Sequence, residues 1–384
     1  MIRSFKIRLL PNEQQQELLW KHANCSRFIW NFGLAYQENL FKNNQKHLSG
    51  YDLKKVVTQI KKQDKYSWLN DISAQTLNNT ILDLDDAYKR FFKKQNRKPK
   101  FKKKNKCKIK FPVRTDCIYF NSLVVNIEKI GKVKYQTNYN LPQGRNVCKF
   151  TNPRIKYENN KWILSFGMEH NNQVQKLTNN SMGIDLGVKD LAVVSYNNEK
   201  LVFNNINKTN RLKSLKNKLK HLQRNVSRKY ETNNINNIFE NKWFKSKNII
   251  KTQNQINKIY NKLSNIRKNY IHQITRELIN KLPKRITMED LNVIGMMKNK
   301  HLSKAIQEQC FYEFIRQMKY KCEMFGIEFV QVNRFYPSSK LCSDCGFKKK
   351  DLKLSDRVYK CEHCGLEIDR DYNAAINLMQ YSNV

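Results

Sequence analysis

Two groups of residues in this 384-residue chain have the types and spacing that chemistry requires. The first is a set of four cysteines near the C-terminus, Cys342 with Cys345 and Cys361 with Cys364, in two C-x-x-C pairs separated by fifteen residues. A glycine follows each pair and allows the backbone to turn tightly around a metal. Because this spacing is typical of a four-cysteine zinc ribbon, the sequence predicts a structural Zn²⁺ site. A metal-free, cysteine-rich loop is the alternative.

The second group consists of three acids that lie far apart in the sequence. Asp185 lies in an apolar strand-like stretch, Glu289 ends a short strand, and Asp371 begins a helix. Each has another interpretation: GIDLG at 183–187 also resembles a phosphate loop of actin-like ATPases, Glu289-Asp290 could begin a helix, and Asp369 or Asp371 could be a helix cap. A carboxylate buried alone is unfavourable by several kcal/mol, so Asp185 should face something positive.

An RNase H-like fold would bring these three acids together at one edge, where its first strand, a neighbouring central strand and a late helix converge. Clustered carboxylates repel one another unless divalent cations lie between them, and hard oxygen ligands suit Mg²⁺ or Mn²⁺. Two such ions about 4 Å apart activate a water and stabilise the leaving 3′-oxygen in phosphodiester hydrolysis.

The charge of the chain points to a polyanionic partner. Lys and Arg number 73 against 32 Asp and Glu, which gives a net charge of +41. Nucleic acid is the leading candidate and an anionic membrane surface the competing one, but no apolar run approaches the ~20 residues that span a bilayer. With no signal peptide and six cysteines scattered outside the ribbon, we expect a reducing, cytoplasmic location associated with the nucleoid, and no membrane.

The steepest charge run extends from Lys89 to Lys110, where more than half of the residues are Lys or Arg and none is acidic. A solvated linker is the alternative interpretation, but the interleaved aromatics favour contact with a nucleic-acid backbone. The candidate nucleic-acid-binding residues are Lys93, Lys94, Arg97, Lys98, Lys100, Lys102, Lys103 and Lys104.

The first half of the chain predicts a helical lobe inserted into a β-rich unit. Residues 1–9 alternate as a half-buried strand, and residues 12–95 carry helical spacing, with Asp71 as the N-cap of one helix. Residues 108–169 contain short β-rich pieces separated by Asn, Gly and Pro, which indicate a small barrel or curled sheet that the N-terminal strand would complete.

The second half predicts an α/β unit with a helical insertion. Residues 181–203 read as a hairpin of two strands turning at 197–198, followed by two long basic amphipathic helices packed as an antiparallel hairpin. A short strand at 286–289, one helix through residues 306–318, and a strand at 328–332 lead to the cysteines.

The order Asp, Glu, zinc ribbon, Asp is more specific than its parts, and with it the chain resembles the TnpB (OrfB) family of transposon-encoded proteins, related to the type V CRISPR effectors. The matching segments, which extend over nearly the whole chain, are KIRLLPNEQQ, FFKKQNRKPKFKKK, GIDLGVKDLA at 183–192, ITMEDLNVIGM at 286–296, FYPSSKLCSDCG at 335–346, YKCEHCG and DRDYNAAINL.

The resemblance implies an α+β multidomain fold. It comprises a wedge-like β-barrel (1–10 and 105–178), an inserted helical recognition lobe with the basic run (11–104), and an RNase H-like (RuvC-like) α/β nuclease domain (179–384). The nuclease domain carries a helical insertion (208–280) and the zinc ribbon (338–367).

By position, the resemblance implies that Asp185, Glu289 and Asp371 are the catalytic acids and hold Mg²⁺ or Mn²⁺. Asp371 is chosen because x-Asn-Ala-Ala follows it, and Asp369 is the reserve. The implied partners are a guide RNA from the transposon end, a double-stranded DNA target cut beside a short target-adjacent motif, and a partner transposase.

The resulting prediction is an RNA-guided, metal-dependent DNA endonuclease with two-metal-ion chemistry. One alternative is an RNA-guided regulator or transposition accessory protein that binds DNA without cleavage. Another is an unguided nuclease or transposase. A tyrosine transposase finds no support, because no His-x-His pair stands near a candidate tyrosine.

Overall fold

The computed structural model describes residues 2–104, 107–145, 147–169, 175–240, 245–352 and 356–381. The chain divides into two compact units, Met1–His170 and Asn171–Val384, each with its own core. No helix in these described ranges is both long enough and apolar enough to cross a membrane.

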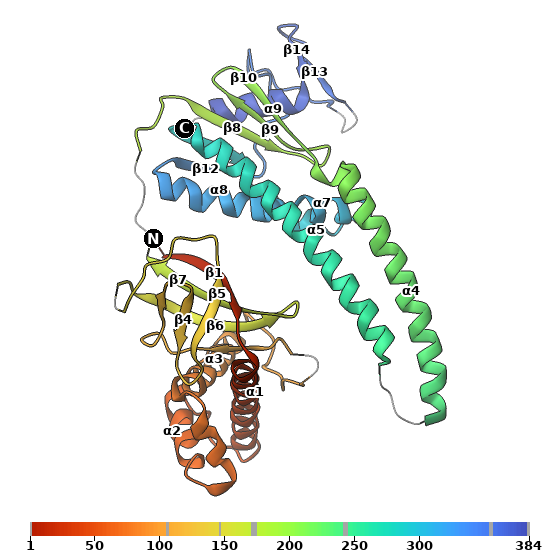
Figure 1. Ribbon diagram of the computed structural model, residues 1–384. Coiled ribbons are helices and arrows are strands. Elements are labelled where there is room, and N and C mark those ends of the chain that lie inside the picture. The colour runs from red at the N-terminus through yellow and green to blue at the C-terminus, as the bar shows by residue number, and fades with distance from the viewer. Residues whose placement is uncertain are drawn as a thin grey trace. The chain divides into compact units, whose positions relative to one another are not determined.

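The first unit is built on a seven-stranded antiparallel sheet with strand order β2-β6-β7-β1-β5-β4-β3. β1 (Ile2–Leu10) pairs with β7 and β5, so the first strand of the chain joins strands that follow the helices in sequence (Figure 1). The other strands are β2 (Lys110–Pro112), β3 (Tyr119–Asn121), β4 (Val124–Ile127), β5 (Gly131–Gln136), β6 (Phe150–Glu158) and β7 (Lys161–Glu169).

Three helices, α1 (Glu13–Lys42), α2 (Gly50–Ile60) and α3 (Ala74–Phe92), lie between β1 and β2 in the sequence. A capping box starts α1, in which Asn12 accepts from the Gln15 backbone N–H at 2.8 Å and Gln15 accepts from that of Asn12 at 3.2 Å. The prediction that Asp71 caps α3 is wrong. Asp71 ends a short 3₁₀ segment (Asp64–Asp71) and pairs with Lys21 at 2.8 Å, so α3 begins only after Ser73.

The second unit contains a five-stranded mixed sheet of order β10-β9-β8-β11-β12. β8 (Ser181–Leu186), β9 (Asp190–Tyr196) and β10 (Glu199–Asn204) pair antiparallel, whereas β11 (Arg285–Glu289) runs parallel to both β8 and β12 (Glu328–Val332). Residues 181–203, predicted as a two-stranded hairpin, therefore form three strands. The predicted turn at Asn197 and Asn198 joins the last two, and both residues have positive φ.

Helices cover this sheet on both faces. Side chains of α5 (Lys247–Asn280) and α8 (Phe311–Phe325) share one core with Met182, Ile184, Ile286 and Met288 of β8 and β11. Because side chains alternate along a strand, the opposite face carries Gly183, Asp185, Thr287 and Glu289. That face is contacted by α9 (Arg370–Gln380), which also touches β9.

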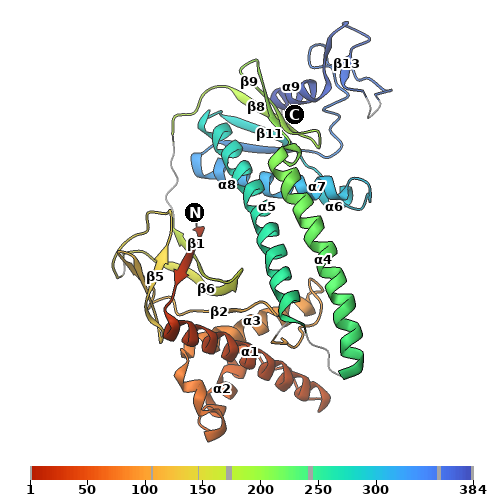
Figure 2. The same cartoon turned by 45° about the vertical axis from the view of Figure 1, so that its right-hand side comes forward.

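The remaining elements of this unit are helical insertions and a small two-stranded sheet. α4 (Asn210–Glu240) and α5 run side by side as the predicted antiparallel hairpin (Figures 1 and 2). α6 (Val293–Met296) is short, and the single helix predicted through 306–318 is two helices, α7 (Ser303–Gln309) and α8, separated by Cys310 at φ +57°. β13 (Val358–Lys360) pairs with β14 (Glu367–Asp369).

Candidate active site and metal centre

Two of the predicted acids come from neighbouring parallel strands. In the register of β8 and β11, Met288 lies beside Ile184. The next residue of each strand is an acid, Asp185 on β8 and Glu289 on β11. Since strands in a sheet lie about 4.8 Å apart and equivalent residues of a parallel pair point to one face, both carboxylates project toward the side that α9 covers.

The third acid comes from α9, and Gly183 is what allows this helix to lie close. A Cβ atom built on Gly183 would stand 2.0 Å from the carbonyl oxygen of Ala375 and 2.4 Å from the nitrogen of Met379. The backbone of α9 therefore passes directly over β8 at the position two residues before Asp185. Asp371 lies one helical turn before Ala375, at the N-terminal end of α9. We call Asp185, Glu289 and Asp371 the acid cluster.

The surroundings of Asp185 disfavour the charged form of its carboxyl group. Burial is the largest cause that raises the pKa of Asp185 well above its ordinary value, although the residue keeps some exposed surface. Repulsion from Glu289 and then Asp371 raises it further, and Arg370 acts in the opposite direction. Burial likewise raises the pKa of Glu289, while a hydrogen bond donated by the Ser338 hydroxyl to its carboxylate lowers it. The repulsion on Asp185 comes from both of the other predicted acids, which fits the placement of all three on the α9 side of the sheet.

Asp369 and Asp371 have different surroundings. Asp369 ends β14, caps α9 by accepting from the Tyr372 backbone N–H at 2.9 Å, and pairs with Lys200 at 3.3 Å. Asp371 is the more enclosed side chain and contacts Arg370 at 3.4 Å. Repulsion from Asp371 also affects Asp185 more strongly than repulsion from Asp369 does.

The acid cluster is open compared with a closed metal site. Among the described residues, the four cysteines are the only group of three or more His, Cys, Asp or Glu residues whose ligand atoms converge on one point, within 4.8 Å of one another, so the three carboxylates are spaced more widely. Carboxylate oxygens that face one side of the sheet, two of them desolvated, fit divalent cations, which would neutralise them and which prefer oxygen donors. The donor set thus suits Mg²⁺ or Mn²⁺ rather than a soft metal.

The four cysteines form the second candidate metal centre. The Sγ atoms of Cys342 and Cys364 lie 3.6 Å apart, as do those of Cys345 and Cys361. Tetrahedral zinc with Zn–S bonds of about 2.3 Å would place sulfurs about 3.8 Å apart. The predicted cluster is therefore confirmed as a geometry that fits a zinc ribbon.

The two cysteine pairs are held by equivalent turns. The Gly346 N–H donates to the Cys342 carbonyl at 3.0 Å, and the Gly365 N–H to that of Cys361 at 3.2 Å. Both glycines have a φ near +74°, which is unfavourable for other residues. Buried Tyr359 packs against this centre and donates its hydroxyl to backbone carbonyls of the first turn.

Two buried asparagines of α9 fasten the zinc ribbon to the helix that carries Asp371. Asn373 donates to the Leu341 carbonyl at 2.6 Å and accepts from the Ser343 N–H at 3.0 Å. Asn377 donates to the carbonyls of Ser338 and Leu341, at 2.7 and 2.8 Å. Because Ser338 also donates to Glu289, ribbon and acid cluster form one hydrogen-bonded unit.

Sequence reasoning did not identify Gly183, Ser338, Asn373 or Asn377 as supports of this site. A signal was present for the two asparagines, which are spaced by four residues on a helix whose other buried positions are apolar. Ser338 and Gly183 carry no comparable signal, because their roles depend on what packs against them.

The predicted nucleic-acid-binding residues lie in the first unit. Lys93, Lys94, Arg97, Lys98 and Lys100 are exposed in the segment that follows α3, and Lys98 pairs with Glu38 at 3.1 Å. Farther along the run the surroundings change. Lys103 and Lys104 are exposed, whereas Lys102 is half-buried, with its Nζ 3.4 Å from the centre of the Trp30 ring.

Three family models match the chain. They are described as a helix-turn-helix domain of OrfB (residues 1–46), an OrfB "Probable transposase" (165–300) and a Cas12f1-like TNB domain (311–378). In fold, the chain is similar to a cryo-EM structure of a Cas12f1–sgRNA–target DNA complex, with a TM-score of 0.62, 14% identity, and 99% of both chains covered.

Curated relatives include a "Putative RNA-guided DNA endonuclease" of Streptomyces pristinaespiralis, 26% identical over 98% of this chain and 88% of the relative. The similarly named InsQ of Escherichia coli (strain K12) is 29% identical over 98% of this chain and 92% of its own. TnpB-like protein L79 of Acanthamoeba polyphaga mimivirus is 32% identical over 52% of this chain and 37% of its own. The OrfB models match residues 1–46 and 165–300, and two curated relatives match 98% of the chain, so the resemblance to the TnpB (OrfB) family extends over almost its full length.

Proposed function

We propose that this protein is an RNA-guided, divalent-metal-dependent DNA endonuclease that cuts duplex DNA beside a short target-adjacent motif. The acid cluster is the observation that carries the proposal. Asp185 and Glu289 project from neighbouring parallel strands toward the helix that brings Asp371, and their repulsion creates a demand for cations. The names of the relatives, which describe RNA-guided DNA endonucleases, point to the same chemistry.

The proposed domain organisation is the one implied by the sequence. Residues 1–10 and 105–178 would be the wedge-like barrel, 11–104 the recognition lobe, and 179–384 a RuvC-like nuclease domain. The sheet order β10-β9-β8-β11-β12, three antiparallel strands continued by two parallel ones, supports an RNase H-like domain. Within it, α4 and α5 would form the insertion 208–280, and the segment with the four cysteines would form the zinc ribbon 338–367.

The three acids would share one role, and separate contacts hold them in position. Asp185, Glu289 and Asp371 would hold Mg²⁺ or Mn²⁺, which when bound supplies an activated water and stabilisation of the leaving oxygen. Glu289 is kept in place by Ser338, and Asp371 by its helix, which Gly183 allows to approach β8. Asp369 is occupied as the helix cap and as the partner of Lys200, which favours Asp371 as the third acid.

The proposed partners follow from the charge of the chain. A net charge of +41 matches a complex that contains both RNA and DNA, and the guide would supply sequence choice by base pairing. The guide would come from the end of the transposon that encodes the protein, and a partner transposase would move the element. A protein held on DNA in this way would be associated with the nucleoid.

Cleavage tests the proposal directly. The protein should be purified with the RNA that co-purifies, the RNA sequenced, and a plasmid carrying the matched target and a library of flanking sequences digested with Mg²⁺. We expect the cleavage rate to fall by about a hundredfold or more in Glu289→Gln and Asp185→Ala. Each change removes a proposed metal ligand, so the stabilisation of the charge that develops in the transition state is lost. The matched control is Asp290→Asn, which removes the adjacent exposed acid that pairs with Arg334.

The outcomes separate the alternatives. A wild-type protein that cuts no faster than Asp185→Ala overturns the nuclease assignment, and tight target binding without nicking then identifies a guided regulator. Cleavage without any discrete co-purifying RNA identifies an unguided nuclease.

A further inference from the structure

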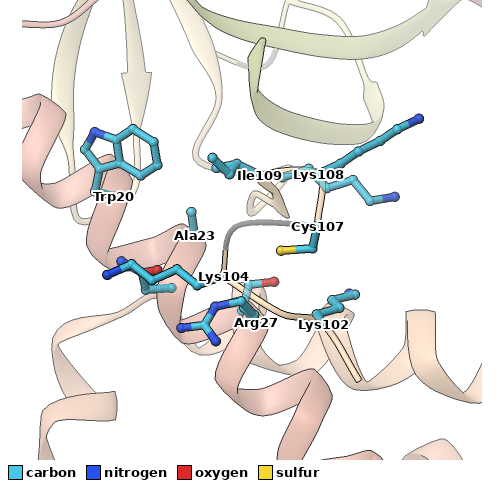
Figure 3. Close-up of a pocket in the computed structure, with 11 residues that line it drawn as sticks. Trp20, Ala23, Arg27, Lys102, Lys104, Cys107, Lys108 and Ile109 are labelled. Carbon is cyan, nitrogen blue, oxygen red and sulfur yellow. The ribbon is translucent and has the colours of Figure 1, made fainter. Parts of the chain in front are cut away.

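A cavity of about 230 Å³ lies in the first unit between α1 and the end of the basic run (Figure 3). One wall is a single face of α1, from which Trp20, Ala23 and Arg27 project at helical spacing. The other wall is formed by residues 102, 104 and 107–110, with Ile109 adding apolar surface. The sequence marked Lys102 and Lys104 as candidate nucleic-acid contacts but gave no sign of the cavity, because its two walls are some 80 residues apart.

The wall formed by the basic run is fixed by hydrogen bonds. Trp30 of α1 donates its indole N–H to the Lys100 carbonyl at 3.1 Å. The Asn31 side chain accepts from the Lys102 backbone N–H at 2.8 Å and donates to the Lys102 carbonyl at 3.1 Å. Beyond the cavity, the Tyr157 N–H donates to the Ile109 carbonyl at 3.0 Å. The lysines at this wall are therefore presented from a held backbone rather than from a solvated tail.

The charged residues that line the cavity are all cations. Its lining contains no Asp or Glu, and in the described part of the chain none of its cations forms an ion pair. The lining cations are Arg27, Lys102, Lys104, Lys108 and Lys110.

Two of these cations lack an anionic partner inside the described ranges of the protein, although the Lys102 ammonium lies over the Trp30 ring. The Nε of Arg27 is buried and has no hydrogen-bond partner among the described residues. Burial is the largest cause that lowers the pKa of Lys102 to about 8, with Lys110 and Arg154 lowering it and Asp83 and Cys107 raising it. Asp83 is itself engaged by Arg154 at 2.7 Å. A buried donor without a partner is unfavourable, so this arrangement is suited to an anion with several acceptor oxygens.

We propose that this cavity is a seat for one backbone phosphate group of a nucleic acid, which rests on the proposed function for the presence of RNA and DNA. Its volume is below the ~300–1,000 Å³ of common small-molecule sites and equals about seven or eight waters, which suits a phosphate with its sugar rather than a whole cofactor. An Arg guanidinium with neighbouring Lys ammonium groups is the side-chain chemistry that phosphate oxygens select. We call this cavity the phosphate seat.

The phosphate seat differs from the first part of the basic run. Lys93 and Lys94 are exposed beyond the end of α3, where water solvates them and salt screens them. The structure thus separates two kinds of cation within one run: a diffuse group at 93–100 and a built site at 102–110 together with Arg27.

The first experiment uses inorganic phosphate as the probe and the full-length protein at low ionic strength. Isothermal titration should show one saturable site in the wild type, lost in Arg27→Gln and retained in the control Lys62→Gln, which changes an exposed lysine outside the basic run. Thermal melting of both variants checks that they fold. Phosphate binding that is absent from the wild type, or equal in the two variants, overturns the proposal.

The second experiment identifies the source of the phosphate. Affinities for a 20-nucleotide RNA and for a DNA duplex of the same length are measured at 0.1 and 0.5 M salt, in the Asp185→Ala background so that failure of the nuclease assignment does not affect the result. Arg27→Gln should weaken binding of one of them by about ten- to a hundredfold at both salts, because a desolvated hydrogen bond is poorly screened.

Lys94→Gln should weaken binding by about two- to threefold at low salt only. The nucleic acid that loses affinity in Arg27→Gln is the one whose phosphate is seated. Equal behaviour of Arg27→Gln and Lys94→Gln at 0.5 M salt contradicts a built site and leaves only diffuse attraction.

Discussion

The zinc ribbon and the acid cluster are bonded to each other, yet they are opposite kinds of site. In the ribbon, the sulfur atoms of four cysteines converge, and two sulfur pairs are each 3.6 Å apart. These four sulfurs would fill all the ligand positions of a tetrahedral ion. In the acid cluster, three carboxylates stand farther apart, and Glu289 and Asp371 both repel charge on Asp185. A closed set of ligands serves stability, whereas an open set leaves positions for water and phosphate.

The two regions are also built differently. The ribbon comes from residues close in sequence, arranged as two equivalent turns, so that its geometry is local. The acid cluster needs two strands and a late helix to be placed correctly by the whole unit. Substitutions in the ribbon should therefore change zinc content and stability, whereas substitutions in the acid cluster should change the response to divalent metal. The expected effects run from the largest to the smallest.

The largest effect is expected from removing a ribbon ligand. Cys361→Ser should lose zinc and unfold the ribbon, because structural zinc supplies roughly 10 kcal/mol or more of binding free energy that is coupled to folding. Metal analysis of the purified protein and thermal melting measure both consequences. Cys117→Ser, a cysteine outside the ribbon, is the control and should retain zinc. Full zinc content in Cys361→Ser would contradict the four-ligand assignment.

The next effect concerns the approach of α9 to β8. Gly183→Ala would force a Cβ against backbone atoms only 2.0 Å away, and backbone cannot yield as a side chain tip can. We expect destabilisation by about 3 kcal/mol, with a melting temperature lower by several degrees. In the control Gly187→Ala the nearest atom is 3.1 Å away, so its effect should be clearly smaller. Equal melting of the two variants would refute the close packing of α9.

A change of opposite sign is expected at the acid cluster. Without divalent metal, Asp185→Asn should raise the melting temperature by about 2–4 °C, because it removes a buried charge that Glu289 and Asp371 repel. The stabilisation that the wild type gains from added Mg²⁺ should disappear in the variant. Calorimetry with EDTA and with Mg²⁺ measures both. A metal-free variant that melts below the wild type would show that the carboxylates do not strain the fold.

This stabilisation should depend on pH in a defined direction. The folded-state pKa values of Asp185 and Glu289 lie above the ordinary values of 3.8 and 4.5, so the folded protein binds more protons than the unfolded chain. Their contribution to stability is therefore favourable at low pH and lost as pH rises through the folded-state pKa values. The advantage of metal-free Asp185→Asn over the wild type should be large at pH 8 and small at pH 5. The reverse trend would contradict the raised pKa values.

The smallest effect is expected from the contact that joins the two regions. Ser338→Ala removes the hydroxyl that donates to Glu289, so the pKa of Glu289 should rise further. The affinity for Mg²⁺, followed by the metal-dependent shift in melting temperature, should fall by about two- to tenfold while zinc content stays unchanged. Ser339→Ala is the neighbouring control. A loss of zinc in Ser338→Ala would instead indicate a role within the ribbon.

The same contrast explains how much of the molecule could be predicted from its sequence. The ribbon was predictable because the spacing of Cys342, Cys345, Cys361 and Cys364 almost determines its geometry. The hairpin of α4 and α5 was predictable because apolar residues recur at helical spacing along both helices. The turn at Asn197–Asn198 was predictable because asparagine tolerates positive φ.

Features that depend on distant neighbours were predicted poorly. The turn between β8 and β9 was missed because apolar residues continue on both sides of it, which merged two strands into one. The break at Cys310 was missed because the apolar spacing continues through it, and only the fold requires a left-handed residue there. Asp71 was chosen as a cap on local grounds, but Lys21, 50 residues earlier, pairs with it. The supports of the acid cluster, Gly183 and Ser338, belong to the same class.

The attachment of the ribbon by Asn373 and Asn377 has a consequence for variation among related proteins. Both amides grip the main chain of residues 338–343, not the side chains that the ribbon displays outward. The outward side chains of the ribbon can therefore be exchanged, by evolution or by an engineer seeking another nucleic-acid contact, without disturbing the carboxylates that the same helix positions.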